Sequence, residues 1–248
     1  MHVFRDEDRP RRAPSSDLAQ DLDKPAADVF TAAQTRRSIR AYKPDRVDSE
    51  TVREIVALAR YAPSGSNIQP WRVHVLTGAT LKRVTGAMQH AFLSDEPGHH
   101  RDYDYYTDPI YEPYLERRRQ CGWGLYGMLG IGRGDREKSK AYRATNYNFF
   151  GAPVGIIFTI DRKLEKGSWL DYGMFLQTIM LAARARGLHT CAEAAIASYP
   201  DIVRRELAIA HEWIVICGMA LGYADIDARI NTFQPARIAL DDFAVFLE

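Results

Sequence analysis

The chain carries Arg36-Arg37-Ser38-Ile39-Arg40 and, one helix-like stretch later, Ala62-Pro63-Ser64-Gly65-Ser66-Asn67-Ile68-Gln69-Pro70-Trp71. The first stretch places three guanidinium groups and a hydroxyl within five residues. Because the planar arginine fork matches the oxygens of a phosphate, this pattern favours an anion site over the alternative, a solvated basic turn. The second stretch is a loop by composition, with prolines, serines and a glycine that allows a ligand to approach the backbone.

The loop from Ala62 to Trp71 also has side-chain amides at Asn67 and Gln69. An amide donates and accepts hydrogen bonds at once, as does the pyrimidine edge of a flavin ring. The alternative is an ordinary connection between a helix and a strand. The order of the two stretches, more than their composition, favours the binding site.

In that order and spacing, the two stretches resemble the FMN-dependent nitroreductase superfamily, in its nitrobenzoate-reductase-like branch. Further likeness extends over residues 28–248 and involves Ala152-Pro153, Ser168 to Gly187, Gly218 to Gly222, and Arg237. Two motifs in the right order are more specific than a lone glycine pattern. The resemblance implies an α+β fold, with a mixed, mainly antiparallel sheet around a buried central helix, in an intertwined homodimer.

The resemblance also implies cofactor contacts. Arg36, Arg37 and Ser38 are similar to residues that bind the phosphate and ribityl chain of FMN, and Arg237 to a tail arginine on the phosphate. Arg40 is similar to a basic residue near N1 and O2 of the flavin ring, where a cation stabilises the anionic reduced form. The loop that contacts FMN from the partner subunit corresponds to Pro63, Ser64, Gly65 and Asn67.

Backbone N–H groups that face flavin N5 and O4 correspond to Glu193, Ala194 and Ala195. This segment departs from the usual pattern, because Ala192 and Ala195 stand where a proline and a glycine are common. No side chain is expected to be catalytic in the acid–base sense, since flavin N5 carries the chemistry. The flavin is expected to take hydride from NADH or NADPH and then reduce a nitroaromatic or quinone-like acceptor in a ping-pong cycle.

A long excursion at about residues 94–136 is expected to act as a lid, because unstructured segments of this size in compact domains are often functional. It is rich in tyrosine and carries Arg117-Arg118-Arg119. Tyr126 is a candidate for stacking on a flat aromatic substrate, and Arg118 for attracting a carboxylate. The alternative for any one of these arginines is a solvated helix face.

Hydrophobic periodicity predicts strands over 71–76, 153–160, 188–191 and 213–221, and helices over 28–34, 48–61, 80–91 and 168–187, with one more from 198. Ser168 and Asp171 resemble a capping box. The helix that follows is apolar all round, which is typical of a buried helix. Residues 1–27 are expected to form a flexible tail and residues 28–248 a single domain.

Composition limits the remaining possibilities. The net charge of +1 gives no overall field for nucleic acid, and no apolar run is long enough to cross a bilayer. The three cysteines are widely spaced without a Cys-x-x-Cys pair, so neither a disulfide framework nor a zinc site is expected and a cytoplasmic location fits. Other flavin reactions on the same scaffold remain open, namely reductive dehalogenation, ene reduction and flavin breakdown. A non-catalytic flavin-binding protein and a binding protein for another phosphate ligand also remain open.

Overall fold

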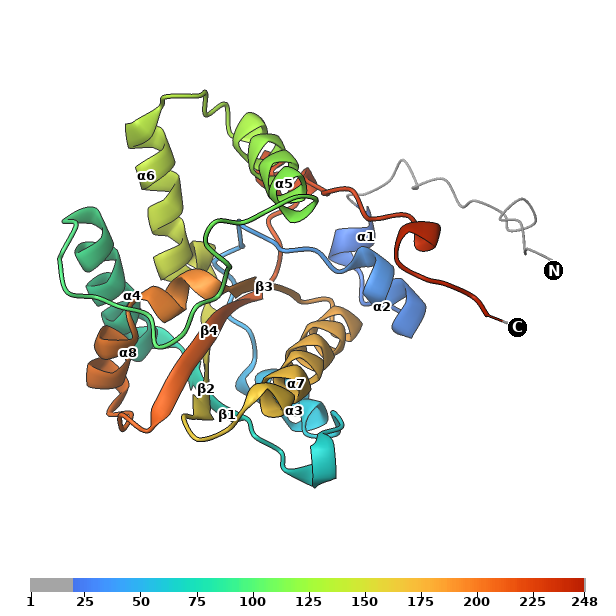
Figure 1. Cartoon of the computed structure of the whole chain (residues 1–248), viewed down its shortest axis with the longest axis horizontal. Coiled ribbons are helices and arrows are strands. Elements are labelled where there is room, and N and C mark those ends of the chain that lie inside the picture. Colours follow the sequence, from blue (N-terminus) through green and yellow to red (C-terminus); the bar gives the residue numbers. More distant parts are fainter. Residues whose placement is uncertain (1–19, 248) are drawn as a thin grey trace.

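The computed structural model describes residues 20–247, and its centre is a four-stranded sheet in the order β1-β2-β4-β3 (Figure 1). The strands are β1 Arg72–Leu76, β2 Val154–Asp161, β3 His189–Glu193 and β4 Trp213–Gly222. All three strand pairs are antiparallel, and an isolated parallel bridge joins Ser38 to Thr190. This arrangement confirms the expected α+β class and the mainly antiparallel sheet.

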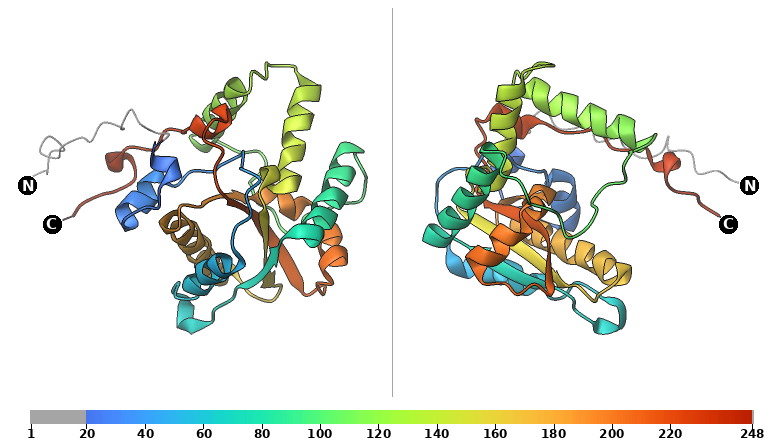
Figure 2. Two further views of the ribbon diagram at one scale, coloured as in Figure 1. Left: turned by 180° about the vertical axis from the view of Figure 1, so that it is seen from behind. Right: turned by 60° about the vertical axis from the view of Figure 1, so that its left-hand side comes forward.

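Helices cover both faces of the sheet (Figure 2). One face packs against α3 (Ser49–Ala59) and α7 (Lys166–Ala185), and the other against α4 (Gly78–Leu93) and α8 (Pro200–Leu207). The other α-helices are α1 Gln20–Asp23, α2 Val29–Thr35, α5 Tyr114–Met128 and α6 Arg136–Ala144. Short 3-10 helices are η2 Gly65–Asn67, η3 Thr145–Gly151, η4 Ala194–Ser198, η5 Arg229–Thr232 and η6 Leu240–Asp242.

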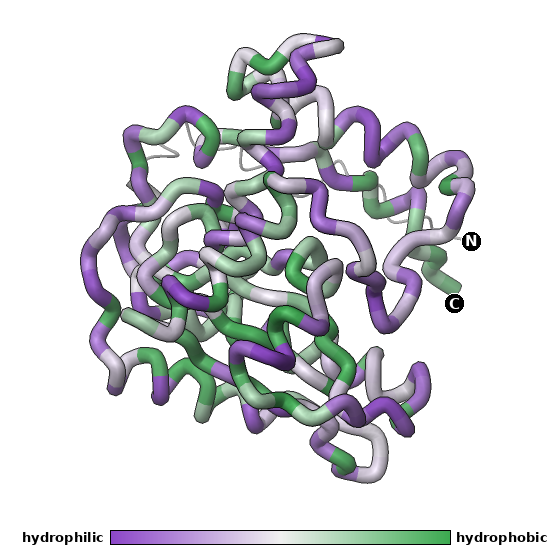
Figure 3. The backbone as a smooth tube through the Cα atoms, turned by 90° about the vertical axis from the view of Figure 1, so that its left-hand side faces the viewer, coloured by the Kyte–Doolittle hydropathy of each residue, from purple (hydrophilic) through white to green (hydrophobic). Residues whose placement is uncertain are grey.

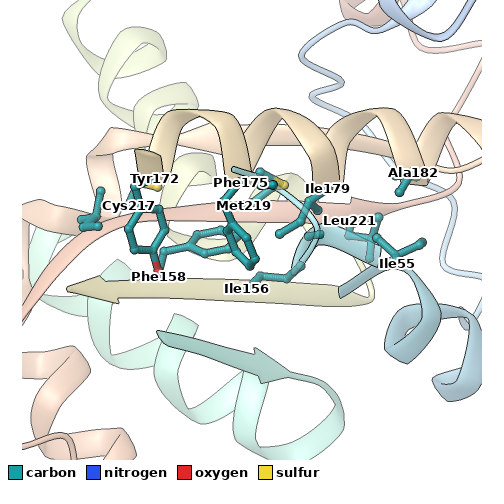
Figure 4. Packing of buried hydrophobic residues seen from close by; sticks show 14 of the residues in the cluster. Ile55, Ile156, Phe158, Tyr172, Phe175, Ile179, Ala182, Cys217, Met219 and Leu221 are labelled. Carbon is teal, nitrogen blue, oxygen red and sulfur yellow. The ribbon is translucent and has the colours of Figure 1, made fainter. Parts of the chain in front are cut away.

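The core between α7 and the sheet is aromatic and β-branched (Figure 4). The Phe175 ring of α7 lies edge-on to Phe158 of β2 and to Tyr172, with ring centroids 6.4 and 5.8 Å away. The Tyr172 hydroxyl donates to the Arg72 and Thr159 carbonyl oxygens at 3.0 and 3.1 Å. The buried phenol therefore loses no hydrogen bond, and it fixes α7 across β1 and β2.

Hydrophobic stretches gather inside the molecule, while hydrophilic stretches dominate the outer loops (Figure 3). Among residues 20–247, no helix combines the length and the apolarity that a membrane span requires.

Helix α7 differs from the sequence prediction at its start and on one face. It begins at Lys166 after Glu165, so Ser168 lies inside the helix rather than at its N-cap. The Asp171 carboxylate accepts a hydrogen bond from the Gly65 N–H instead of completing a capping box. The side that faces away from the sheet is uncovered in the single chain, with Leu170 72% and Met174 37% exposed. Helix α7 has apolar residues on all sides, but this chain buries only the side that faces the sheet.

Local signals placed other helix ends correctly. The Asp28 and Asp48 side chains accept from the Thr31 and Thr51 N–H groups and cap α2 and α3. Proline is tolerated in the first turn of a helix because the N–H that it lacks has no partner there, and Pro200 begins α8.

The expected N-terminal tail falls partly outside the described residues, which begin at residue 20. Where it is described, Leu22 is only 4% exposed and packs with Ile39 and Ala224. Nearby, the Ala26 N–H donates to the Arg184 carbonyl oxygen at 2.9 Å. Leu22 and Ala26 therefore pack onto the domain, while the residues between them are exposed.

The first part of the 94–136 excursion is fixed to the core. Asp102 pairs with the buried Arg204 guanidinium and, at 3.1 Å, with Arg162. The Tyr103 hydroxyl donates to the Ile216 carbonyl oxygen at 2.5 Å, and its ring lies edge-on to Trp169. Any lid motion must therefore involve residues after this anchor.

Asp102→Asn is expected to destabilise the fold by about 3 kcal/mol, because it leaves the charge of the buried Arg204 with one fewer carboxylate partner. Asp201, at 3.2 Å, remains as a second partner. Urea unfolding measures the free energy, with Asp104→Asn as the matched control on an exposed neighbour. Equal midpoints for the two variants would contradict the anchoring role.

Candidate active site

The arginine-rich segment runs beside β3. The Ile39 N–H donates to the Thr190 carbonyl oxygen at 3.2 Å, next to the parallel bridge between Ser38 and Thr190. In this parallel register Arg36 lies beside the start of β3 and Arg40 lies near its end, where its charge acts on Glu193. The structure thus assembles two of the predicted cofactor-binding stretches on one side of the sheet.

Guanidinium groups gather at this place. Burial and the nearby Arg237 guanidinium lower the pKa of Arg36, which is partly buried. Within the part of the chain that the structure describes, no carboxylate forms an ion pair with Arg36 or Arg237. Arg37 is 7% exposed, and its Nε lies 2.6 Å from the Gln234 amide oxygen when that amide faces it. Two like charges held close, without a counter-charge, fit the phosphate of FMN.

Arg40 is held by a residue that the sequence analysis did not single out. Asn231 is 2% exposed, and its Oδ1 accepts from the Arg40 N–H at 2.8 Å while its Nδ2 donates to the Ala41 and Asp225 carbonyl oxygens. The Arg40 guanidinium donates back to the Ser38 carbonyl oxygen at 3.1 Å. The hydrogen bond between Arg40 and Asn231 joins residues that are 191 positions apart, and no local pattern signals it.

Several polar atoms around Arg40 are buried without a hydrogen-bond partner in the described chain, namely Tyr42 Oη, Tyr142 Oη and both carboxyl oxygens of Glu193. Burial raises the pKa of Glu193 well above its ordinary value, against the nearby Arg40 and the Ala220 backbone. Burial raises the pKa of Tyr142 to about 12. Buried groups of this kind normally have partners, so their clustering fits a site for a polar ring or for ordered water.

The predicted loop at Pro63, Ser64, Gly65 and Asn67 lies elsewhere. Its Gly65 N–H donates to the Asp171 carboxylate in the second turn of α7, at 3.1 Å. The arginine segment instead follows Thr35, whose hydroxyl accepts from Arg184 in the last turn of α7. Asp171 and Arg184 are thirteen positions apart in the helix, which corresponds to about 20 Å at about 1.5 Å per residue. Figure 1 shows η2 and the arginine segment near opposite ends of α7. One chain therefore does not bring the two motifs together.

The loop itself has a defined shape. Ser66, Asn67 and Gln69 have φ angles of 49°, 57° and 51°, in the left-handed region that costs most residues energy. The Ser64 hydroxyl accepts from the Gln69 N–H at 3.0 Å and closes the turn. Strained backbone that is held by specific bonds is common at ligand-binding loops.

Asp171→Ala is expected to weaken FMN binding about tenfold, because the loop loses a charge-assisted hydrogen bond of about 1.5–3 kcal/mol that holds its shape. Asp171→Asn is the matched control, since the amide oxygen still accepts from Gly65 and most of the affinity returns. FMN fluorescence titration measures both. Equal affinities of the alanine variant and the unmodified protein would show that the loop does not reach the cofactor.

The two predicted substrate contacts lie on α5. Helix α5 passes over the segment that leads to Arg237, where a Cβ at Gly124 would come within 2.5 Å of the Phe233 ring (Figure 2). Tyr126 lies edge-on to Tyr142, with centroids 6.0 Å apart, and so borders the cluster around Arg40. Arg118 instead stacks over Tyr106 at 5.1 Å.

Comparison with known proteins agrees with this geometry. The model of the family described as "Nitroreductase family" matches residues 33–223. A 4-nitrobenzoate reductase of Pseudomonas putida is 38% identical over 89% of this chain and 96% of its own length. A chloronitrobenzene nitroreductase of Comamonas testosteroni is 39% identical over 86% and 93%.

Among solved structures, the FMN-dependent nitroreductase NfnB of Mycobacterium smegmatis, in complex with NADPH, superposes with a TM-score of 0.84 at 33% identity. The superposition covers 89% of this chain and all of that one. The family model extends over the arginine segment, α7 and the whole sheet. The chain therefore belongs to the nitroreductase family.

Proposed function

We propose that the protein is a homodimeric, FMN-dependent NAD(P)H nitroreductase that reduces nitroaromatic or quinone-like acceptors. The observation that carries this proposal is the pair Arg36 and Arg237, which lie close to each other beside β3 and form no ion pair with a carboxylate among the described residues. Family membership and relatives named for nitroaromatic reduction support the reaction class.

Each part of the site has a distinct task. Arg36, Arg37 and Arg237 bind the phosphate, with Ser38 at the ribityl chain, and Arg40 presents its charge to the N1 and O2 edge of the ring. The backbone at Ala194 and Ala195 faces N5 and O4. When bound, FMN supplies hydride transfer, first accepting from the nicotinamide and then donating to the acceptor.

The second subunit is proposed because the site is split in one chain. The loop at Pro63 to Asn67 lies about 20 Å along α7 from the arginines, so a two-fold pairing of antiparallel α7 helices supplies the loop from the partner. Leu170 and Met174 form an apolar patch on the exposed side of α7. The C-terminal arm, which projects from the body, exposes Phe243, Val245, Phe246 and Leu247 (Figure 1). Together they favour an intertwined homodimer.

The acceptor is proposed to bind under α5, where Tyr126 borders the cluster around Arg40. An aromatic side chain there suits a flat ring. Arg118 is proposed to attract a carboxylate such as that of 4-nitrobenzoate, after leaving Tyr106. The excursion at 94–136 acts as the lid beyond its anchor at Asp102 and Tyr103. With its three cysteines free, the protein fits a cytoplasmic location.

The reaction is tested by steady-state turnover of the purified, FMN-loaded dimer with NADH or NADPH and a panel of acceptors. 4-Nitrobenzoate, nitrobenzene and benzoquinone are expected to be reduced, with parallel double-reciprocal plots as the sign of a ping-pong cycle. Turnover of a halogenated or α,β-unsaturated acceptor alone would assign a different flavin reaction. Flavin that is never reduced by either nicotinamide would indicate a non-catalytic flavin-binding protein.

A further inference from the structure

Glu193 is the most deeply buried carboxyl group beside the proposed flavin site. It ends β3 opposite Gly218 of β4 and is 3% exposed. Neither of its oxygens makes a well-formed hydrogen bond in the described chain, although the Ala220 N–H lies near enough to favour the ionised form weakly. An isolated carboxylate is costly to bury, whereas the neutral acid is far less so. The family resemblance implies a role only for the backbone of Glu193, so the side chain is unexplained.

Among the residues that the structure describes, Arg40 is the permanent charge that acts on this side chain. The guanidinium is close enough to favour the ionised form of Glu193, yet it makes its hydrogen bond to the Ser38 carbonyl oxygen. The charge on Arg40 is therefore uncompensated while Glu193 is a neutral acid. If Glu193 loses its proton to solvent, a carboxylate forms beside the guanidinium and cancels most of that charge.

We propose that Glu193 is a positioning residue that sets the charge that Arg40 presents to the flavin: the neutral acid leaves that charge available, and the carboxylate removes it. This inference rests on the proposed function, because it needs FMN beside Arg40. It adds a control of cofactor affinity by a side chain that does not itself touch the reacting atoms.

The other groups that face Glu193 ionise only at higher pH. Burial raises the pKa values of Cys191 and Cys217 to about 12 each. The same cause raises the pKa of Tyr142 to about 12 and that of Tyr42 well above its ordinary value. Burial raises the pKa of Glu193 well above its ordinary value as well, but a carboxyl group starts from a much lower value than a thiol or a phenol. Glu193 is therefore the member of this cluster that ionises first as the pH rises.

FMN affinity is expected to fall as the pH rises, because Glu193 ionises before the other groups around it. Below the raised pKa of Glu193 the site holds the full charge of Arg40, and FMN binds tightly. Above it the charge is cancelled, and the dissociation constant of FMN rises about tenfold, the loss expected when a charged hydrogen bond becomes a neutral one. The flavin itself also titrates as the pH rises, so only a comparison of variants isolates Glu193.

The test is FMN fluorescence titration of the dimer from about pH 6 to about pH 10, in the unmodified protein and in Glu193→Gln. The glutamine has the same shape and no titratable proton, so this variant is expected to lack the additional tenfold loss at high pH. Glu212→Gln, at an exposed position before β4, is the matched control and should follow the unmodified protein. Arg40→Gln is expected to lack the additional loss too, because it has no charge to cancel.

Three results separate the outcomes. Parallel pH profiles of the unmodified protein and Glu193→Gln would overturn the inference while leaving FMN binding, and thus the proposed function, intact. A tenfold weaker affinity of Glu193→Gln at pH 6 would also overturn it, since the carboxylate would then be the working form. Failure of the unmodified protein to bind FMN at any pH would overturn the proposed function, and the inference with it.

Discussion

Replacing both Arg36 and Arg237 with alanine is expected to weaken FMN binding by a factor of about a hundred or more. Each guanidinium that binds a phosphate contributes about 1.5–3 kcal/mol when shielded from water, and 1.4 kcal/mol is a factor of ten. The two side chains lie close enough to repel each other, and burial and this repulsion lower the pKa of Arg36. The free protein should therefore be no less stable without them.

This separation of affinity from stability makes the double variant informative. FMN dissociation constants come from fluorescence titration, and thermal unfolding of the FMN-free protein gives the stability. Arg205→Ala, which removes an exposed arginine on α8, is the control and should bind FMN normally. A double variant that purifies with FMN and keeps its activity would contradict the phosphate site.

Placing glutamate at both Leu170 and Met174 is expected to convert the protein to monomers and to remove FMN. In the single chain Leu170 is 72% and Met174 37% exposed on α7, so the Leu170 substitution disturbs few contacts within the chain and the Met174 substitution keeps part of its side chain in solvent. In a dimer paired through α7, they would bury like charges against each other, which costs several kcal/mol. Because the loop at residues 63–67 lies far from the arginines of its own chain, the monomer should lack half of the site.

Light scattering after gel filtration measures the mass, and the flavin absorbance of the same fractions measures the cofactor. The control is Leu93→Glu, which changes a half-exposed leucine at the end of α4 on the other side of the molecule. A monomer that still binds FMN with normal affinity would show that one chain is sufficient. A stable dimer in the double variant would place the interface on another surface.

The sequence predicted what depends on short-range patterns. The apolar run at 153–160 became β2, and the caps at Asp28 and Asp48 began α2 and α3, because alternation and capping act within a few residues. The predicted start of α7 at Ser168 was wrong because a long-range contact replaced the expected local one. By spacing, Asp171 resembles the acidic partner of Ser168 in a capping box. Its carboxylate instead accepts a hydrogen bond from the Gly65 N–H, which is 106 positions away in the chain.

In the candidate site too, the sequence signalled the local motifs but not the long-range contacts. The arginine motif lies beside β3 through the pairing of Ile39 with Thr190. The cofactor-binding roles that the family resemblance implies for these two segments stay predictions. The contacts of Asn231 and the unpaired hydroxyls of Tyr42 and Tyr142 depend on how distant segments pack, and nothing in their neighbouring residues marks them. The burial of Glu193 likewise follows from its place in the sheet rather than from its sequence neighbours.

The measurement that tests the central proposal most directly is the visible spectrum of the purified protein, followed by anaerobic addition of NADH and NADPH. Oxidised flavin bands that bleach with one of these donors, and that return when 4-nitrobenzoate is added, are the result that we expect. The absence of flavin bands, even after the protein has been incubated with FMN and desalted, would contradict the assignment of the arginine cluster as a flavin phosphate site.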